Sequence, residues 1–421
     1  MPGDECSPRR SDTVAVTGLG AVSPFGWSLG SLWEGLRAGV SAIGPFDRFD
    51  HSGHRTHIAA QVDMAAQPAR LGGRAARMSH ADRFAVAAAR EAAARACLDI
   101  AGGADRVGVY FGTCTGGMIE AENYFEALLA AAGKAEPPAL RSLASQQQNG
   151  PGDSVARDLG VGGPVQSVSA ACPSGAMAIG DAMRAVRCGE VDVAIAGGSD
   201  GLCRLTYAGF NALRAVDERS CRPFRLDRAG LSLGEGAAVI VLELLERALA
   251  RGARPLAIAS GEAASCDAHH MTSPPSDGAG AVEAIHAALS DARIDPDAID
   301  FVNAHGTGTP LNDAAEAEAL RAVFGSRLTA IPVTSTKALV GHLLGAAGAL
   351  EAAATILCLN AREVHPMPDD GSSEPESRLR LVLGRSLHLP RARHALSTSL
   401  AFGGANAALI FTRHGEGSVE C

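Results

Sequence analysis

The sequence predicts an α/β protein whose sheets are covered by helices on both faces. Segments with strand character alternate with segments of helical periodicity through both halves of the chain. The strand segments contain apolar runs, which are typical of strands that are buried on both faces. Hydrophobic residues make up 47% and charged residues 20% of the 421 residues, as in a soluble globular protein with room for two domains.

The first half of the chain carries its strand and helix signals in regular order. Residues 13–17 form an apolar strand that enters a glycine-containing turn. This turn lacks the third glycine of a dinucleotide-binding fingerprint, and no acidic residue ends a second strand about 20 positions later, so we expect a tight turn and no cofactor. The other predicted elements are an Ala-rich helix at 80–100, strands at 105–118, 163–170 and 191–200, a helix at 173–189, and a strand leading into a helix at 237–252.

The second half restarts the same rhythm after a boundary that we place near residues 250–262. The predicted elements are strands at 255–268, 298–310 and 331–337, helices at 280–294, 314–325 and 342–360, and two strands around a glycine turn at 394–411. Polar loops are predicted at 70–83 and 368–378. We therefore divide the chain into two α/β halves, 11–258 and 259–414.

Composition and charge exclude several classes of protein. A formal net charge of −9 argues against a general nucleic-acid binder. The ten cysteines include no C-x-x-C pair and are too sparse for a disulfide scaffold, which favours reduced thiols in the cytoplasm. The first residues contain no apolar signal-peptide core, and no run of about 18 apolar residues is evident, so we expect neither a signal peptide nor a membrane span.

Cys172 lies between the predicted strand at 163–170 and the predicted helix at 173–189. This position puts its sulfur near a helix N-terminus, where the partial positive charge favours the thiolate. Pro173 is compatible with the first helical turn because its missing N–H would have no partner there. From this segment alone, Cys172 is either a nucleophile or a small buried residue.

His305 ends an apolar strand in the stretch VNAHGTGTPLND. A histidine in this position can face a cavity, and the hydroxyl groups of Thr307 and Thr309 could hydrogen-bond an amide. The alternative is a structural histidine whose ring nitrogens are satisfied within the core.

Lys337 and His342 precede a predicted helix of small residues in TSTKALVGHLLGAAG. A helix start favours a neutral imidazole, although a capping histidine on a core helix fits equally well. The lysine is unusual because the 37 basic residues comprise 35 Arg and only two Lys, and a compact ammonium differs from a planar guanidinium. Phe402 begins a Gly-Gly turn that could be a gate, an oxyanion donor or an ordinary hairpin.

Together, a thiol, two imidazoles, a lysine and a glycine turn are the groups needed for thioester acyl transfer. At these residues the sequence resembles the elongating β-ketoacyl-[acyl-carrier-protein] synthases, the Cys-His-His condensing enzymes of the thiolase superfamily. The resemblance runs from VTGLGAVSPFG to FGGANAALIF, and NAHGTGTPLND and STKALVGHLLGAAG are highly specific to that family. It implies a thiolase-like, duplicated five-layer α-β-α-β-α fold and a homodimer or a close heterodimer.

The resemblance also implies a division of labour in a decarboxylative condensation. Cys172 would take an acyl chain from an acyl carrier protein as a thioester. His305 and His342 would stabilise the enolate that forms when a malonyl unit loses carbon dioxide. The backbone N–H groups of Cys172 and Phe402 would form an oxyanion hole for the acyl carbonyl, as developing oxyanions need donors that are already in place.

Three further assignments follow from the same resemblance. Lys337 would form a network with Glu316 and Asp313 that orients the histidines. Thr307 and Thr309 are similar to the residues that hydrogen-bond the pantetheine arm of the carrier. No metal and no cofactor are implied.

Three residues depart from the family pattern. Pro173 follows the nucleophile where a small polar residue or Ala is usual, and Ala401 precedes Phe402 where Gly is common, which could stiffen the turn. Thr115 falls where a bulkier apolar residue often lines the acyl pocket. These departures suggest a specialised pathway, such as polyene or polyketide synthesis, with a longer, unsaturated or functionalised acyl chain.

The acidic carrier protein requires a local basic surface on this acidic chain. The candidates are Arg70, Arg74, Arg77 and Arg83 as one cluster and Arg214 as another, with a solvated basic face as the alternative.

Other classes of protein fit the same residues less well. A thiolase uses a second catalytic cysteine near the C-terminus, where only Cys421 lies, past the FGGAN turn, and initiating synthases replace the second histidine with Asn. A chain-length-factor-like partner subunit of a heterodimeric enzyme typically lacks the nucleophile that Cys172 supplies. A Cys-His thioester hydrolase is disfavoured because no glycine-elbow signature is seen.

Overall fold

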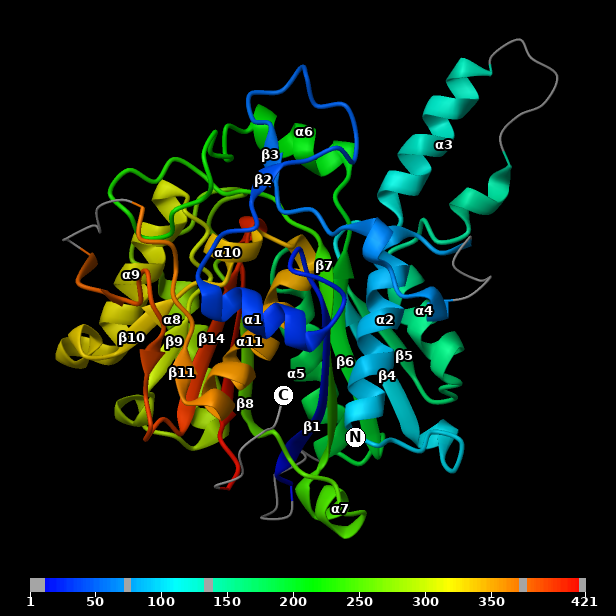
Figure 1. Ribbon diagram of the computed structural model, residues 1–421. Helices are drawn as coiled ribbons and strands as arrows, with labels where there is room; N and C mark the ends of the chain where they lie inside the picture. The colour runs from blue at the N-terminus through cyan, green and yellow to red at the C-terminus, as the bar shows by residue number, and fades with distance from the viewer. Residues whose placement is uncertain (1–11, 72–76, 132–138, 371–376, 416–421) are drawn as a thin grey trace.

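The computed structural model describes residues 12–71, 77–131, 139–370 and 377–415, and Figure 1 shows them as one body around a large sheet. The first half contains the strands and helices β1 Val14–Val22, α1 Leu29–Ala38, α2 His80–Arg95, β4 Val107–Gly112, α3 Met118–Ala130, α4 Gly150–Leu159, β5 Val165–Val168, α5 Ser174–Arg187, β6 Val193–Asp200, α6 Arg204–Ala212, β7 Gly236–Leu244 and α7 Leu245–Ala250. A small hairpin of β2 Gly44–Pro45 and β3 Ile58–Ala59 is added to it.

The second half repeats this succession of elements. Its elements are β8 Ala257–Cys266, α8 Ala279–Ala292, β9 Phe301–Asn303, α9 Pro310–Phe324, β10 Pro332–Thr334, α10 Lys337–Val340, α11 Ala347–Ala361, β14 His394–Leu400 and β15 Ala405–Thr412. Short strands complete it: β11 Glu363–Val364 pairs with β13 Leu387–His388, and β12 Arg380–Leu381 extends the main sheet.

The strand order shows that the fold is duplicated. The 11-stranded sheet has the order β12-β10-β9-β14-β15-β8-β1-β7-β6-β4-β5. Numbered along the chain within each half, the main strands follow the order 3-2-4-5-1 in both halves, and the two first strands, β8 and β1, pair at the centre. In both halves the outer pairs are parallel and the pairs nearest the centre are antiparallel.

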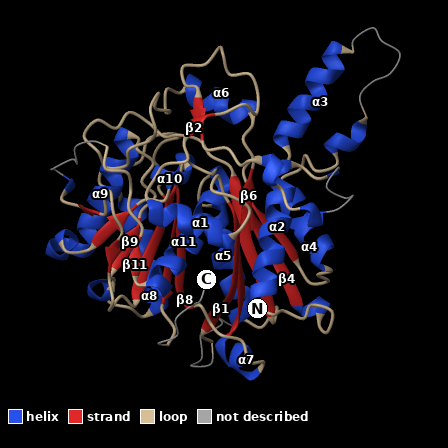
Figure 2. Ribbon diagram, in the orientation of Figure 1, coloured by secondary structure: helices blue, strands red, loops and turns tan. Residues whose placement is uncertain are grey.

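The helices form three layers around the two half-sheets (Figures 1 and 2). Helices α2 and α4 cover the outer face of the first half-sheet, and α8 and α9 lie on the outer side of the second. The corresponding helices α5 and α11 pack against each other between the half-sheets and contact strands of both halves. The predicted duplicated five-layer α-β-α-β-α architecture is therefore confirmed, and the division at 258/259 stays a proposal.

Close packing between β1 and α2 explains Gly18 and Gly20, which we predicted to lie in a turn. The strand β1 continues through them to Val22, so the predicted end at residue 17 was wrong. A Cβ at Gly18 would lie 2.1 Å from the carbonyl oxygen of Ala92, and a Cβ at Gly20 would lie 2.0 Å from that of Ala88. Glycine and alanine are needed here so that the strand and the Ala-rich helix can approach each other.

The central helix α11 is unusually apolar because both half-sheets cover it. The segment Leu344–Ala361 has a mean hydropathy of 1.5 over 18 residues, which is long and apolar enough to cross a membrane by those criteria, yet 89% of it is buried inside the protein. The expectation that the chain lacks such an apolar run was wrong. Burial between the half-sheets identifies the run as a core helix.

Candidate active site

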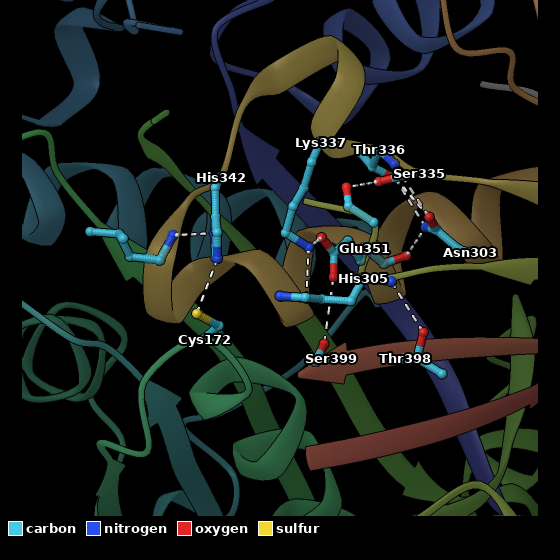
Figure 3. Close-up of polar contacts among 12 residues, drawn as sticks. Cys172, Asn303, His305, Ser335, Thr336, Lys337, His342, Glu351, Thr398 and Ser399 are labelled. Atoms are coloured by element: carbon cyan, nitrogen blue, oxygen red, sulfur yellow. Dashed lines mark hydrogen bonds and ion pairs between the residues drawn. The ribbon is translucent and has the colours of Figure 1, made fainter. Parts of the chain in front are cut away.

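The duplication brings Cys172 and His342 together. Cys172 lies in the turn between β5 and α5, and His342 lies between α10 and the start of α11. Because α5 and α11 are corresponding helices that pack side by side, the turns before them meet. The His342 Nε2 atom lies 3.0 Å from the Cys172 sulfur, as Figure 3 shows.

The turn that carries Cys172 is held by Ser174. The Ser174 hydroxyl accepts a hydrogen bond from the Ala170 N–H at 2.9 Å and donates to the Ala171 carbonyl at 2.5 Å. Ala171 adopts the left-handed region with a φ of 57°, which a non-glycine residue adopts only when its surroundings enforce it. Pro173 is the N-cap of α5, so its missing N–H leaves no helical bond unmade.

The hydrogen bonds around His342 fix its tautomer. The Leu344 backbone N–H donates to His342 Nδ1 at 3.1 Å. A neutral imidazole that accepts at Nδ1 carries its proton on Nε2. The Nε2–H of His342 is therefore the donor that points at the Cys172 sulfur.

His305 is fixed in the same way by Lys337. His305 follows β9, and the Lys337 ammonium lies 3.0 Å from His305 Nδ1. Since an ammonium can only donate, His305 also carries its proton on Nε2. The two imidazole rings lie edge to face with centroids 5.4 Å apart.

The partner of Lys337 is Glu351 on α11, with which it forms a buried ion pair (Figure 3). The expected network of Lys337 with Glu316 and Asp313 is therefore corrected. Glu316 instead accepts the backbone N–H groups of His305 and Gly306, each at 2.8 Å.

Asp313 supports the loop after His305 rather than Lys337. It accepts the backbone N–H of Gly308 at 3.1 Å and that of Phe224 at 2.7 Å. Glu316 and Asp313 thus fix the conformation of the His305 loop by accepting hydrogen bonds from its backbone N–H groups. The ammonium of Lys337 acts on the imidazole itself.

Burial dominates the electrostatics of these groups. Burial, together with the Lys337 charge, lowers the pKa of both His305 and His342 well below the ordinary value of 6.5, so both rings are neutral at pH 7. Burial also raises the pKa of the Cys172 thiol to about 12, against the opposing effect of Lys337. The expectation that the helix N-terminus favours a thiolate is not met, because desolvation outweighs it.

This environment predicts how the Cys172 thiol responds to pH. A thiol with a raised pKa stays protonated at neutral pH, and its thiolate fraction grows about tenfold per pH unit. We expect the rate of Cys172 alkylation by a haloacetamide, followed by peptide mass spectrometry, to rise throughout about pH 7 to 9. A rate that already levels off near pH 7 would contradict the pKa direction.

Cys172, His305 and His342 also lie close enough together to be considered as a metal site. One ligand atom from each of Cys172, His305 and His342 lies within 4.8 Å of the others. A neutral histidine that binds a metal through Nε2 must carry its proton on Nδ1, yet both Nδ1 atoms here accept hydrogen bonds from Lys337 and Leu344. The arrangement therefore suits an anion that accepts two N–H bonds, not a cation.

The three groups open into one cavity of about 370 Å³. Its lining residues include the two threonines of the His305 loop, the Phe402 turn and an exposed arginine: Cys172, His305, His342, Thr307, Thr309, Phe402 and Arg214. The hydroxyl groups of Thr307 and Thr309 lie 2.9 Å apart within this lining. The structure thus brings these sequence-predicted residues together around one hollow.

The Phe402 turn is part of the lining of this cavity. Neither Phe402 nor Cys172 donates its backbone N–H to an acceptor within the described part of the chain. Ala401 is extended, with φ −144° and ψ 159°, so the alanine that replaces the usual glycine is unstrained here. The Phe402 ring lies 6.0 Å from that of Phe210 between centroids.

Thr115, which was predicted to line the acyl pocket, lies outside the active-site cavity. It is buried, and its hydroxyl donates to Asp200 at 2.9 Å. The residues that line the active-site cavity do not include it. Its polarity is therefore explained by Asp200 and gives no support to a functionalised acyl chain.

The arginines of the predicted basic cluster have different surroundings where the structure describes them. Arg77 is exposed beside a separate hollow, Arg83 hydrogen-bonds the Met78 carbonyl, and Arg74 lies outside the described residues, as does the side chain of Arg70. Among the candidates that can be placed, Arg214 lies at the active-site cavity.

Comparison with known proteins agrees with this geometry. A sequence profile described as the N-terminal domain of β-ketoacyl synthase matches residues 11–248, and the profile of its C-terminal domain matches residues 256–369. The chain belongs to the β-ketoacyl synthase family. A curated relative, 3-oxoacyl-[acyl-carrier-protein] synthase 2 of Synechocystis, is 38% identical over 411 residues, covering 95% of this chain and 98% of the relative.

Solved structures of ketosynthases have the same fold. The ishigamide ketosynthase/chain length factor matches with a TM-score of 0.89 and 34% identity over 97% of this chain and all of that chain. A type II ketosynthase, solved in complex with its acyl-carrier protein, matches with a TM-score of 0.86 and 30% identity over 97% of this chain and all of that one.

Sequence reasoning missed two residues of this synthase site. Glu351 is the one acidic residue in the apolar stretch GALEAAATILCLN, and a buried charge in such a helix needs a partner. Ser174 stands in the first turn of α5, where serine commonly bonds to nearby backbone. Both signals were present in the sequence, but neither names the partner.

Proposed function

We propose that this chain condenses an acyl thioester held on Cys172 with malonyl-[acyl-carrier-protein] to give β-ketoacyl-[acyl-carrier-protein]. The observation that supports this most directly is the tautomer pair: His305 and His342 both keep their proton on Nε2, the nitrogen that is free of the Lys337 and Leu344 donors. Two neutral donors beside a sulfur nucleophile suit an enolate that forms next to an acyl-cysteine.

In the first step, the Cys172 sulfur attacks the carbonyl carbon of the incoming acyl thioester. A carbon–sulfur bond forms to Cys172, the bond to the pantetheine sulfur breaks, and the thiol proton ends on that leaving sulfur. The free backbone N–H groups of Cys172 and Phe402 stabilise the oxyanion during this exchange.

In the second step, a malonyl thioester loses carbon dioxide. Its carbon–carbon bond breaks, and the electron pair becomes an enolate whose oxygen accepts the Nε2–H groups of His305 and His342. The enolate carbon then attacks the acyl carbonyl on Cys172. The new carbon–carbon bond forms, the bond to sulfur breaks, and the released thiolate takes up a proton.

The cavity suits a thioester delivered on a carrier arm. Thr307 and Thr309 place hydroxyl groups in the lining of the cavity that also contains the exposed Arg214 and the Cys172 sulfur. A pantetheine arm carries amides that these hydroxyls can hydrogen-bond. We propose that the acidic carrier docks beside Arg214, and that fatty acid, polyene or polyketide-type elongation is the setting.

The docking proposal predicts the effect of charge reversal at Arg214. Arg214→Glu should lower kcat/KM for a carrier-bound acyl group by about tenfold at low salt, because encounter with an acidic carrier is electrostatically steered. Turnover of a small acyl thioester should stay unchanged. The matched control is Arg254→Glu, an exposed arginine away from the cavity; an equal loss in both variants would argue against docking at Arg214.

A second synthase-like chain is proposed to pair at the edge strand β5. This strand ends the main sheet, its first residues are exposed, and Val165 keeps 41% of its surface. Helix α3, which projects from the body in Figure 1, exposes Phe125 and Leu129 as well. An open strand edge and exposed apolar side chains are surfaces that a partner chain covers.

Light scattering on the purified chain tests this pairing. We expect a homodimer that Val165→Lys shifts toward monomer, since the charge would fall within the interface. A stable monomer of the unaltered chain at micromolar concentration would favour a heterodimer with a separate synthase-like subunit.

We place the protein in the cytoplasm, because all eight cysteines in the described part of the chain are free thiols.

Product analysis tests the reaction itself. Acyl- and malonyl-carrier proteins are mixed with the protein, and carbon dioxide and the β-ketoacyl carrier are measured. Equal amounts of both support the condensation. Release of free acid would indicate a hydrolase, and the absence of both products would indicate a non-catalytic partner subunit.

A further inference from the structure

Asp200 is a buried carboxylate at the end of β6, next to the active site. The residue is fully buried, and the groups that hydrogen-bond it are neutral. They are the hydroxyl groups of Thr113 at 2.8 Å and Thr115 at 2.9 Å, and the backbone N–H groups of Cys114 at 2.8 Å, Thr115 at 2.9 Å and Gly345 at 2.7 Å. A carboxylate that accepts so many bonds fixes the chain segments that donate them.

The two carboxylate oxygens hold two segments of the chain. Oδ1 accepts the Thr113 and Thr115 hydroxyls in the loop after β4. Oδ2 accepts both the Cys114 N–H of that loop and the Gly345 N–H in the turn before α11. Asp200 therefore bridges the loop at 113–115 and the turn at 344–345, which are far apart in sequence.

The turn at 344–345 is the one that fixes His342. Leu344 donates its N–H to His342 Nδ1, and its backbone lies in the left-handed region with a φ of 53°. A non-glycine residue holds such a conformation only when neighbouring contacts enforce it. The bond from Gly345 to Asp200 holds the next peptide group and so stabilises the strained residue.

The segments that Asp200 bridges are closely packed against each other. A Cβ at Gly345 would lie 2.7 Å from the Cys114 nitrogen and 2.8 Å from Asp200 Oδ2. The turn is thus in direct contact with the loop and the carboxylate. Displacing one of them displaces the others, because closely packed segments transmit small shifts.

We propose that Asp200 is a positioning residue for decarboxylation, which locks the Leu344–Gly345 turn and thereby the tautomer and direction of His342. The proposal rests on the condensing function given above. Acylation of Cys172 depends on its sulfur and on the backbone donors of Cys172 and Phe402. Decarboxylation depends on the Nε2–H of His342, so loss of Asp200 should affect the second half-reaction selectively.

Asp200→Asn provides the test. The amide keeps the shape of the side chain, but in either orientation its NH₂ group faces at least one backbone N–H, which can only donate. We expect malonyl-carrier decarboxylation, measured as carbon dioxide released, to fall by about tenfold to a hundredfold. Cys172 acylation, measured by intact mass, should stay within about threefold of the wild type.

Ser199→Ala is the matched control. Ser199 is the buried neighbour of Asp200 on β6, and its hydroxyl donates to the Ala81 carbonyl at 2.7 Å, away from the turn. We expect this variant to lose stability without changing the ratio of the two half-reactions. If Asp200→Asn does not fold, Asp200→Glu takes its place, since it keeps the charge but shifts the acceptor atoms.

The outcomes separate this proposal from the proposed function. A ratio of decarboxylation to acylation that equals the wild-type ratio, in whichever Asp200 variant folds, overturns the positioning role. An equal change of that ratio in Ser199→Ala also overturns it. Failure of the wild-type protein to form acyl-Cys172 refutes the condensing function instead.

Discussion

Cys172→Ala is expected to abolish the acyl adduct and to lower condensation on the order of 10⁴-fold or more, because Cys172 is the one thiol among the described residues that line the cavity with the two imidazoles. Wild-type protein incubated with an acyl-carrier protein should gain the mass of one acyl group. The variant should gain none. The thiol is 3.0 Å from His342 Nε2, so alanine removes the nucleophile and leaves the donors in place.

Cys114→Ala is the matched variant for this experiment. Cys114 is a second, partly buried thiol, and burial strongly raises its pKa, with smaller contributions from the charges of Asp200 and Cys172. We expect Cys114→Ala to be acylated like the wild type. Acylation that survives in Cys172→Ala and disappears in Cys114→Ala would move the nucleophile to Cys114.

The proposed catalytic groups could be predicted from sequence because each stands out locally. Cys172 lies between a strand and a helix, His305 follows an apolar strand, and Lys337 is one of only two lysines. The pairing of Lys337 with Glu351 could not be predicted, because it joins α10 to a helix that is positioned by packing between the half-sheets. Sequence patterns report local periodicity and leave contacts across the core undetermined.

The fold shows the same division between local and non-local information. The alternation of strands and helices was sufficient to predict the α/β class, and the structure adds the repeated 3-2-4-5-1 order. The helix α4 was missed because its first residues, Gly-Pro-Gly, are typical of a loop, while its stability comes from packing on α2. The start of α11 was placed at His342 but lies at Ala347, because small residues carry little periodic signal.

Lys337→Met is expected to have the second large effect, on stability and on decarboxylation together. The ammonium and Glu351 are both almost fully buried, so removing one partner leaves an unpaired buried carboxylate. Breaking such a pair costs about 3–5 kcal/mol of unfolding free energy. The cost is lowered when Glu351 takes up a proton, and burial already raises the pKa of Glu351 to about 7.

The double variant Lys337→Met/Glu351→Gln separates the two effects. Both charges are absent, so chemical denaturation should show a stability closer to the wild type than that of Lys337→Met. Decarboxylation should stay low, by about a hundredfold, because His305 has lost the donor at Nδ1 and its Nε2–H is no longer enforced. Glu351→Gln alone keeps the lysine and controls for the loss of the carboxylate.

The pKa shifts give this prediction a second readout. The positive charge of Lys337 lowers the pKa of His305 and His342, so its removal should raise both toward 6.5 while burial still opposes protonation. An imidazole that gains a proton at mildly acidic pH can be followed by NMR of histidine-labelled protein. If the double variant decarboxylates at the wild-type rate with unchanged histidine titrations, Lys337 does not set the tautomer of His305, and its role is limited to neutralising Glu351.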